Sequence, residues 1–421
     1  MKRLLVLGAG TAGTMVVNTL RSRLTDEWQI TVVDQDNVHH YQPGYLFVPF
    51  GTADPDDLTR PRTQTMPEGV DLVLGEIDRV DTERNTVVLV NGRELAYDQL
   101  VIATGTTPRP DQTPGMDGDG WRTSVFDFYT LEGATALRDR LADFDGGRIV
   151  VHVTEMPIKC PVAPLEFAFL ADDHFRQLGI RDNVEITYVT PLDGAFTKPV
   201  ASKLLGGMLD DRTIHLEPDF VIERVDTDLG AIVSYDEREI PFDLLVTVPL
   251  NMGADFVGRS GIGDDLNYVR VDQHTFLARD LDNVFAIGDA ADLPTSKAGS
   301  VAHFAVDVFV DNFLDHIAGL PMERSFDGHA NCFVESGDGK ALLLDFNYDT
   351  QPLTGKYPYP GLGPLSLLQE TRANHLGKQA FQWIYWHLLL PGHHLPVPTE
   401  MSMRGKHEAT ESQDKELEAS R

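Results

Sequence analysis

A glycine-rich turn between a strand and a helix constrains the fold of this chain more than any other feature. The apolar run Arg3–Leu7 predicts a buried strand, and G-A-G-T-A-G follows from Gly8 to Gly13. An amphipathic helix is expected next, then a second strand over Gln29–Val33 that ends in Asp34. A GxGxxG motif alone is weak evidence. Between a strand and a helix, with an acid 21 residues after its last glycine, it is typical of a dinucleotide-binding Rossmann unit.

The residues of this turn have separate expected roles. We expect Gly8, Gly10 and Gly13 to admit a pyrophosphate to the N-terminus of the helix, and Asp34 to accept hydrogen bonds from a ribose. The alternative is a glycine-rich turn followed by an ordinary surface aspartate. The position of the motif favours the nucleotide.

Two distant segments complete the same pattern. D-Q-L-V-I-A-T-G predicts a strand that ends at Thr104 and Gly105, and N-V-F-A-I-G-D predicts another that ends at Gly288 and Asp289. In a doubly wound sheet, strand ends meet at one crevice. Together with the first motif, these segments resemble the FAD-binding domain of glutathione-reductase-like flavoproteins. The resemblance implies that all four residues lie near an FAD.

The segment between these markers has the strand pattern of a second Rossmann unit without its nucleotide residues. R-I-V-V-H-V predicts a strand from Arg148, but the turn after it contains Pro157, Cys160 and Pro161 and no glycine. The next predicted strand, Val184–Val189, is followed by Thr-Pro instead of an acid. We therefore expect a domain that kept the fold and lost the NADH site, because a glycine-free turn denies a pyrophosphate its close backbone approach.

The chain contains two cysteines, Cys160 and Cys332. Cys160 precedes a helix expected from Pro164 to about Leu178 and follows Lys159; a helix N-terminus and a neighbouring cation both favour the thiolate. In a cytosolic protein, a cysteine pair that oxidises is usually catalytic. If Cys332 comes within reach, a dithiol takes the place of NADH as electron donor. The alternative is a buried structural cysteine.

At this point the sequence resembles the sulfide:quinone oxidoreductases, over nearly the whole chain to about residue 398. The resemblance is carried by P-I-K-C-P-V-A-P-L-E, by N-V-F-A-I-G-D-A-A-D-L-P-T-S-K, and by F-D-G-H-A-N-C with D-F-N-Y-D-T-Q-P-L after it. It implies FAD, an active-site pair matching Cys160 and Cys332, a quinone acceptor and peripheral membrane attachment. Since no cysteine precedes Cys160, the chain looks like the two-cysteine, mitochondrial-like branch, with FAD bound non-covalently.

The mechanism that this resemblance implies is sulfur exchange. Hydrosulfide attacks a bridge between the two cysteines, leaving a persulfide on one and a thiolate on the other. Electrons pass to FAD and then to quinone, and the sulfane sulfur goes to an unidentified acceptor. We favour Cys160 as the cysteine that meets the flavin; the reverse assignment, and an extra sulfur in the bridge, stay open.

Two further residues are candidates for the site. Glu166 matches an acidic position thought to handle protons in some members of the family, and a surface glutamate with an i,i+4 contact is the alternative. Lys297 could place its charge near the flavin and stabilise the reduced anion, and a solvated lysine is the alternative. No His or Cys spacing, including that of His174, His303 and His329, resembles a metal site.

The charge balance bears on partners. Asp and Glu number 65 against 35 Lys and Arg, a net charge of −30. Nucleic acid is thereby an improbable partner, because phosphates would be repelled. Acidic runs on a low-lysine background suggest adaptation to high salt, which screens self-repulsion; an acidic protein of no special habitat is the alternative. We read no export signal and no spanning helix, and expect the cytoplasmic side of a membrane.

We predict an α/β architecture of two Rossmann-like domains and a small C-terminal region. The expected limits are an FAD domain over 1–110 and 269–324, an inserted domain over 111–268, a C-terminal region over 325–398 and a disordered tail over 399–421. A helix expected from about Leu367 ends in F-Q-W-I-Y-W-H-L-L-L, Phe381–Leu390. Its aromatic residues suit a helix lying in the membrane interface; a buried core or dimer helix is the competitor, and homo-oligomer formation stays open.

Three other functions compete. A type II NADH:quinone oxidoreductase should have a second glycine-rich loop and a second acid, which this sequence lacks. The flavoprotein subunit of a flavocytochrome sulfide dehydrogenase should have an export signal and a haem partner. A redox-sensing or binding flavoprotein should show no turnover.

Overall fold

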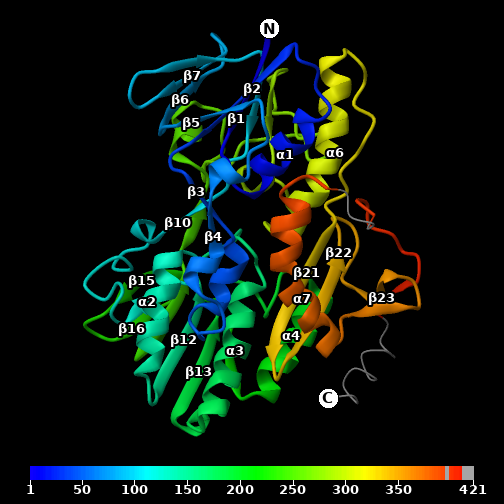
Figure 1. Cartoon of the computed structure of the whole chain (residues 1–421). Coiled ribbons are helices and arrows are strands. Elements are labelled where there is room, and N and C mark those ends of the chain that lie inside the picture. The colour runs from blue at the N-terminus through cyan, green and yellow to red at the C-terminus, as the bar shows by residue number, and fades with distance from the viewer. Residues whose placement is uncertain (394–397, 410–421) are drawn as a thin grey trace.

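Two five-stranded parallel sheets, one above the other in Figure 1, form the framework of the protein. The computed structural model describes residues 1–393 and 398–409. The upper sheet has the strand order β20-β9-β1-β2-β5. Its strands are β1 (Lys2–Leu7), β2 (Trp28–Asp34), β5 (Val70–Leu74), β9 (Gln99–Ile102) and β20 (Val284–Ala286). Long apolar runs form these strands because both faces of the sheet are covered.

Helices α1 (Thr11–Arg21) and α6 (Gly299–Ile317) pack against each other on one face of the upper sheet (Figure 1). Helix α1 begins directly after the glycine-rich turn, as predicted. Most of α6 is buried, from Val301 to Phe313, so it is hydrophobic on nearly all sides. The N-termini of α1 and α6 both point toward the junction with the lower sheet.

The lower sheet has the order β11-β18-β12-β13-β14, again parallel. Its strands are β11 (Val125–Phe126), β12 (Gly147–Val153), β13 (Val184–Val189), β14 (Ile214–Glu217) and β18 (Leu244–Val248). Its helices are α2 (Leu131–Ala142), α3 (Ala163–Leu178) and α4 (Pro199–Asp211). The predicted α/β architecture with two Rossmann-like sheets is confirmed.

The lower sheet is inserted into the sequence of the upper one. The chain leaves through β10 (Thr107–Arg109) and returns through β19 (Leu250–Met252), and these two strands pair antiparallel. Each sheet also carries a three-stranded antiparallel extension. These are β6 (Ile77–Asp81), β7 (Thr86–Leu89) and β8 (Glu94–Ala96) above, and β15 (Ile222–Asp226), β16 (Ala231–Ser234) and β17 (Glu239–Pro241) below. The domain limits at residues 110, 268 and 324 stay predictions.

The C-terminal region lies against both sheets. Strands β21 (Ala330–Gly337) and β22 (Lys340–Phe346) form a hairpin that turns near Gly339, and β21 packs on α3 and α6. Strands β23 (Leu353–Tyr359) and β24 (Gly363–Leu367) follow, and then helix α7 (Arg372–Ile384), which continues as one π-helical turn over Tyr385–Leu389. The start predicted for this helix is wrong, because β24 uses the residues up to Leu367 as a strand.

The prediction of a disordered tail from residue 399 is also wrong for residues 399–409. Strand β25 (Lys406–Glu408) pairs with β23. The Lys406 ammonium, itself buried, forms an ion pair with the buried carboxylate of Asp345 on β22, and His329 Nε2 donates to the other oxygen of that carboxylate over 2.8 Å. A buried charge that needs a partner therefore ties this segment down. Residues 410–421 of the predicted tail lie outside the described residues.

Besides several short 3-10 turns, the described chain also has the short strands β3 (Val38–His40) and β4 (Thr59–Pro61) and the short helix α5 (Asp255–Arg259). One apolar core runs through both sheets, and the hairpin β21–β22 adds Cys332 and Leu344 to it. Within the two described stretches of the chain, none of the helices combines the length and the apolar character needed to cross a bilayer.

Candidate active site between the two sheets

A cavity of about 400 Å³ lies between the upper sheet, the lower sheet and α7. Segments far apart in sequence line it, because the carboxyl ends of parallel strands meet at one edge. Of the residues predicted to contact a cofactor or substrate, the cavity is lined by Gly8, Gly10, Asp34, Thr104, Gly105, Cys160, Glu166, Gly288, Asp289 and Lys297.

The glycine-rich turn has the close backbone packing that its sequence predicts. Gly8 has a φ of +95°, and a Cβ there would lie 2.5 Å from the carbonyl oxygen of Ala103. A Cβ on Gly13 would lie 1.9 Å from the carbonyl oxygen of Gly8. Gly10 differs, because a Cβ there meets nothing within 4 Å and would project into open space. Because they have no side chain, Gly8 and Gly13 thus allow the strand and the helix to pack closely, while Gly10 leaves space at the N-terminus of α1.

The residues around this turn fit a dinucleotide. The cavity reaches the N-terminus of α1 at Thr11 and Ala12, where backbone N–H groups and the helix dipole favour an anion. Thr104 Oγ1 is buried and, in the described part of the chain, has no hydrogen-bond partner. A buried hydroxyl without a partner costs free energy, so it indicates a polar ligand group on the cavity side.

Asp34 and a buried arginine form one charged corner of the cavity. Asp34 Oδ2 accepts the N–H of Ala9 at 2.7 Å, and Oδ1 lies 3.1 Å from a guanidinium nitrogen of Arg62. Arg62 also donates to the carbonyl oxygen of Ala9 at 2.6 Å. Sequence reasoning missed Arg62, because it lies in a short 3-10 turn with no motif around it. Its positive charge suits a phosphate-bearing ligand.

A second feature that the sequence did not reveal is a hydrogen-bonded chain from the C-terminal π-helical turn to α1. The Tyr385 hydroxyl lies 2.8 Å from Thr11 Oγ1 and 2.7 Å from His39 Nε2, and His39 Nδ1 is 3.0 Å from the carbonyl oxygen of Ala9. Burial lowers the pKa of His39 to about 3, so its imidazole is neutral. The C-terminal region therefore closes the nucleotide end of the cavity.

The glycine-free turn after β12 brings Cys160 to the wall of the same cavity. Its backbone N–H donates to the carbonyl oxygen of Lys297 at 2.7 Å, and its carbonyl oxygen accepts the N–H of Ala163 at 2.8 Å. The Tyr129 hydroxyl donates to the same carbonyl oxygen at 3.2 Å. These bonds hold Cys160 at a φ of +44°, a conformation that non-glycine residues seldom adopt and that often marks functional sites.

The expectation that Cys160 favours its thiolate is wrong for this state of the protein. Burial raises the pKa of its thiol to about 12, and the nearby Glu166 carboxylate raises it further. Lys378 and the N–H of Ala163 at the start of α3 lower the pKa, but less than burial raises it. Lys159 is not among the groups that shift this pKa, and its ammonium donates to Gln42 Oε1 at 3.0 Å.

Cys332 lies on β21, buried, and both cysteines are free thiols. Burial raises the pKa of the Cys332 thiol, and the proximity of Cys160 raises it further, while a hydrogen bond from Ser296 lowers it. Cys160 is therefore close enough to influence the ionisation of Cys332. Their joining as a disulfide stays a prediction.

Lys297 is buried, so the alternative of a solvated lysine is wrong. Its ammonium donates to the carbonyl oxygens of Asp289 and Ala291, each at 2.9 Å, and lies 4.0 Å from the ring centroid of Tyr268. Burial lowers its pKa to about 8. A cation is thus held at the cavity wall next to the Cys160 turn, and its action on a flavin stays a prediction.

Glu166 is fully buried, so the alternative of a surface glutamate is also wrong. It forms an ion pair with Lys378 of α7, and the same oxygen accepts the N–H of Glu335 at 2.7 Å. Burial raises the pKa of its carboxyl group. Lys378 lines the cavity but was not predicted, because only the tertiary contact between α3 and α7 reveals its role.

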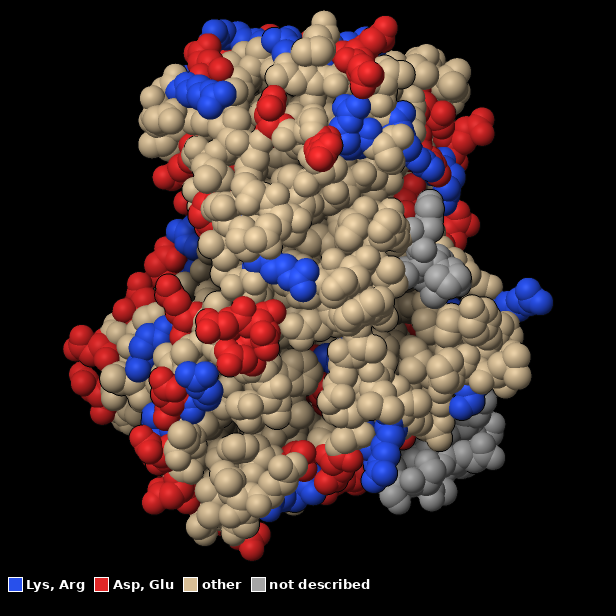
Figure 2. Space-filling model, in the orientation of Figure 1, with Lys and Arg blue, Asp and Glu red and all other residues tan. Residues whose placement is uncertain are grey.

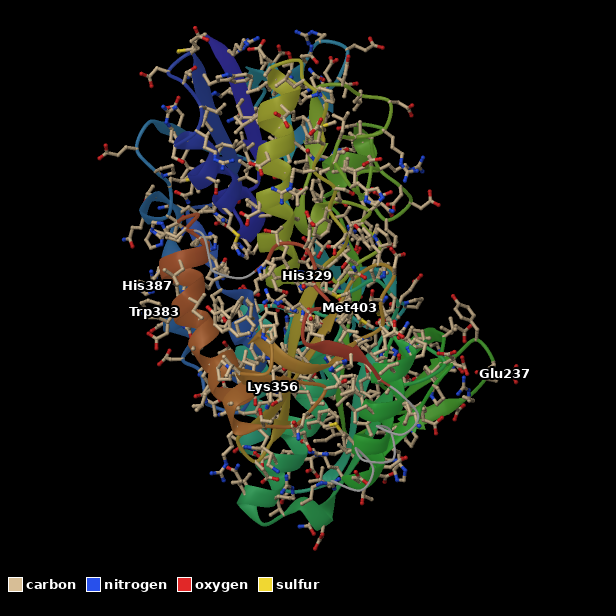
Figure 3. The ribbon with its side chains drawn as sticks, turned by 90° about the vertical axis from the view of Figure 1, so that its right-hand side faces the viewer. Glu237, His329, Lys356, Trp383, His387 and Met403 are labelled. Atoms are coloured by element: carbon tan, nitrogen blue, oxygen red, sulfur yellow. The ribbon has the colours of Figure 1, made fainter. Side chains whose placement is uncertain are left out.

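The aromatic segment Phe381–Leu390 divides between the core and the surface, so the prediction that it lies whole in a membrane interface is wrong. Tyr385, Trp386, Leu389 and Leu390 are buried. Trp383 is 58% exposed and lies with His387 on the outer side of α7 (Figure 3). On the face that α7 crosses, the surface over α7 carries few charged side chains, but a cluster of acidic side chains lies beside it (Figure 2).

The three histidines considered above serve other contacts. His329 bonds Asp345 and the carbonyl oxygen of Thr399, His174 packs on Phe50, and His303 lies in α6. No group of three His, Cys, Asp or Glu side chains in the described stretches is arranged to hold a metal ion.

Comparisons with known proteins agree with the resemblance drawn from the motifs. The family model "Pyridine nucleotide-disulphide oxidoreductase" matches residues 2–307. The mitochondrial sulfide:quinone oxidoreductase of Dictyostelium discoideum is 25% identical over 351 residues, 82% of this chain and 78% of that protein. The mitochondrial enzyme of the same name from Schizosaccharomyces pombe is 26% identical over 417 residues, 91% of this chain and 89% of that protein.

A solved structure shares the fold. The sulfide:quinone oxidoreductase of Aquifex aeolicus superposes with a TM-score of 0.78 at 19% identity, covering 93% of this chain and 92% of that one. The similarity therefore includes the C-terminal region beyond the part that the family model matches.

Proposed function

The chain belongs to the pyridine nucleotide-disulphide oxidoreductase family, and within it we propose that the protein is an FAD-dependent sulfide:quinone oxidoreductase. The relatives that match most of its length carry that name. The observation that carries the proposal is the turn after β12, which has a cysteine where a nicotinamide-binding relative needs glycine. Cys160 of that turn lines the same cavity as the glycine-rich turn of the upper sheet.

The chain's own residues have distinct parts in this proposal. FAD, when bound, supplies a two-electron acceptor that a quinone can reoxidise. Gly10, the N-terminus of α1 and Arg62 hold its phosphates, and Asp34 holds a ribose. Lys297 favours negative charge on the reduced cofactor from the cavity wall.

Cys160 and Cys332 carry the sulfur chemistry. Hydrosulfide attacks their disulfide, so that one S–S bond breaks, a new one forms to the attacking sulfur, and the other cysteine leaves as a thiolate. A second nucleophile then takes the sulfane sulfur as the pair re-forms its disulfide and gives up two electrons. The environment of Cys160, next to Lys297 and the start of α3, favours it as the cysteine that faces the cofactor.

Attachment to the membrane surface belongs to the same proposal. Quinones dissolve in the bilayer, so their reductase needs contact with it. The outer side of α7 presents Leu376, 61% exposed, and Trp383, 58% exposed. We propose that this side of α7 rests on the cytoplasmic surface of a membrane. With a net charge of −30, the protein suits a salt-rich environment, where its repulsion from anionic lipids is screened.

Anaerobic stopped-flow spectroscopy tests the proposal. Sulfide should bleach the flavin of the purified protein, and a short-chain quinone should restore the oxidised spectrum. NADH should do neither, because the second Rossmann unit has no glycine-rich turn. Bleaching by NADH but not by sulfide would contradict the proposal and favour a type II NADH:quinone oxidoreductase.

A further inference from the structure

We propose that Glu335 and His375 conduct a proton between the cysteine pair and the surface, through the ion pair of Glu166 with Lys378. The inference rests on the proposed function, since it concerns the same two cysteines. It assigns to these four side chains the transfer of the proton that the cysteine pair releases, a step that the flavin and sulfur chemistry above does not assign to any residue.

The inner part of the route begins at the cavity. Glu166 lines it together with Cys160 and Lys378. Glu166 Oε1 is occupied by Lys378 and by the N–H of Glu335. Glu166 Oε2 is buried and, among the described residues, has no hydrogen-bond partner. A buried carboxylate oxygen without a donor is a costly arrangement unless a proton or a transient donor visits it.

The outer part runs from β21 to α7. Glu335 is 1% exposed and lies three residues after Cys332 on the same strand. Its two carboxylate oxygens are 3.0 and 2.9 Å from His375 Nδ1. His375 Nε2 is 2.9 Å from the side-chain amide of Gln379, which is exposed on α7. Polar side chains therefore continue from the Glu335 carboxylate to the surface, and on the cavity side the charge of Lys378 acts on this carboxylate and lowers its pKa.

The charges of this cluster require a mobile proton. Two buried carboxylates, Glu166 and Glu335, face one ammonium, that of Lys378, so the three leave one negative charge unbalanced. Burial raises the pKa of Glu335, and Lys378 and His375 lower it, but less than burial raises it. A proton on His375 or on a carboxylate restores neutrality. The other charged neighbours are Asp289 across the cavity and Arg212, which bonds Glu370 and the carbonyl oxygen of Ser336.

The chemistry supplies the proton that this cluster would carry. Oxidation of two thiols to a disulfide breaks two S–H bonds, forms one S–S bond, and releases two electrons and two protons. Both electrons and one proton go to the flavin, so the second proton has to leave through the protein. Burial raises the pKa of both cysteines and so favours their thiol forms, whose protons need an acceptor when the pair oxidises.

Oxidation of the fully reduced holoprotein by ferricyanide tests the route without sulfide or quinone. Ferricyanide accepts electrons but no protons, so every proton must reach the solvent, where a pH-indicator dye reports it. After the flavin oxidises, the wild-type protein should show a second phase in which the thiols oxidise. His375→Gln and Glu335→Gln should slow that phase about a hundredfold, and added imidazole should restore the rate of His375→Gln.

His387→Gln is the matched control, because His387 follows His375 along the same helical segment, is exposed, and has its Nδ1 2.9 Å from the carbonyl oxygen of Trp383, outside the proposed route. It should oxidise like the wild type, and all variants should keep their flavin and melting temperature. The proposal is overturned if His375→Gln keeps the wild-type rate, if imidazole has no effect, if His387→Gln is equally slow, or if the wild type has no thiol phase.

The two proposals fail separately. If sulfide does not bleach the wild-type flavin, the proposed substrate is wrong, whereas the ferricyanide result still decides the proton route. If sulfide does bleach the flavin but the His375 and Glu335 variants release protons at the wild-type rate, only the proposed proton route is wrong.

Discussion

The backbone N–H of Cys160 donates to the carbonyl oxygen of Lys297 over 2.7 Å, which joins the turn of the lower sheet to the loop that follows Asp289 in the upper one. This bond fixes the cysteine next to a buried cation. Cys160 follows a strand of the lower sheet and Lys297 follows a strand of the upper sheet. The bond between them therefore joins the two sheets at one site.

Replacing either cysteine should stop the sulfur chemistry while leaving the fold intact. In Cys160→Ser and Cys332→Ser, we expect bleaching of the flavin by sulfide to slow by about three orders of magnitude or more, because covalent chemistry loses its nucleophile or its partner. Stopped-flow absorbance gives the rate, and the flavin content with the melting curve is the control. Sulfide oxidation that persists in Cys160→Ser would refute the assignment.

Two glycines of the same turn should respond differently to alanine. Gly13→Ala forces a Cβ to within 1.9 Å of the Gly8 carbonyl oxygen, so the protein should be destabilised. Gly10→Ala meets no protein atom within 4 Å, so the fold should stay stable while flavin affinity falls. Gly206→Ala on α4, whose Cβ would lie 3.9 Å from Ala195, is the control.

Urea unfolding and flavin titration separate these effects. Gly206→Ala should match the wild type in both measurements, or unfold at slightly higher urea, since alanine favours a helix by up to about 1 kcal/mol over glycine. If Gly10→Ala lowered the urea midpoint as well as the flavin affinity, the proposal that Gly10 leaves space for the ligand without affecting packing would be contradicted.

Lys297 should give flavin reduction a dependence on pH. Burial lowers the pKa of this ammonium to about 8, so it is charged below that pH and neutral above it. If its charge stabilises the reduced flavin, the rate of reduction by sulfide should contain a component that falls as the pH rises through about 8. Lys297→Met should lose that component, and Lys340→Met, in the exposed hairpin turn, should keep it.

The same shift predicts the effect of Lys297 on stability. Its folded pKa lies below that of the unfolded chain, so between about 8 and 10.5 the unfolded state binds more protons. Stability should therefore rise with pH across that window, and Lys297→Met should remove this part of the rise. Urea midpoints measured at several pH values check it, and a wild-type slope retained by Lys297→Met would contradict it.

The outer side of α7 should decide membrane binding. Leu376→Glu and Trp383→Glu should each reduce co-flotation with vesicles, because a charge replaces an exposed apolar side chain. Leu178→Glu, a substitution at an equally exposed leucine of α3, should not. Binding to anionic vesicles should grow with added salt, the opposite of a polybasic anchor. Flotation that weakens steadily with salt would contradict the model.

Lys406 should stabilise the protein through Asp345. Burial alone would raise the pKa of Asp345, but His329 and Lys406 together lower it. Lys406→Met leaves a buried carboxylate short of a partner, at a cost of about 3–5 kcal/mol. Urea unfolding measures this cost, and Lys406→Met with Asp345→Asn should recover part of it. A single variant as stable as the wild type would show that the pair contributes nothing.

The direction in which the stability contribution of Asp345 changes with pH follows from the same pKa shift. Because the folded pKa of Asp345 is depressed, its contribution should be complete above the unfolded value of about 4 and be lost as the pH falls further.

The sequence predicted the features that local chemistry determines. The strand, glycine-rich turn and helix around Gly8 could be predicted because a pyrophosphate site needs them at fixed spacing. The loss of glycine before Cys160 was likewise visible in a single turn. Both sheets and about a third of the cavity lining follow from such segments, since parallel strands bring their ends together.

The sequence did not reveal contacts that depend on tertiary packing. Arg62, Tyr385 and Lys378 reach the cavity from elements without a motif. The ionisation of Cys160 was predicted in the wrong direction, because the helix N-terminus and Lys159 are visible in the sequence but burial is not. The aromatic run after Phe381 was assigned whole to the membrane, because its pattern does not show that a π-helical turn directs Tyr385 inward.

Through strand β25, a few residues at the end of the described chain contribute to the stability of the hairpin that carries Cys332. Lys406 neutralises a carboxylate on the strand that pairs with the Cys332 strand. A premature stop codon just ahead of this lysine would spare both cysteines and the glycine-rich turn, yet it would leave the buried Asp345 carboxylate of the β21–β22 hairpin without its ammonium partner. Such an allele should resemble a misfolding defect rather than a catalytic one, with poor accumulation of protein that still carries all its reactive groups.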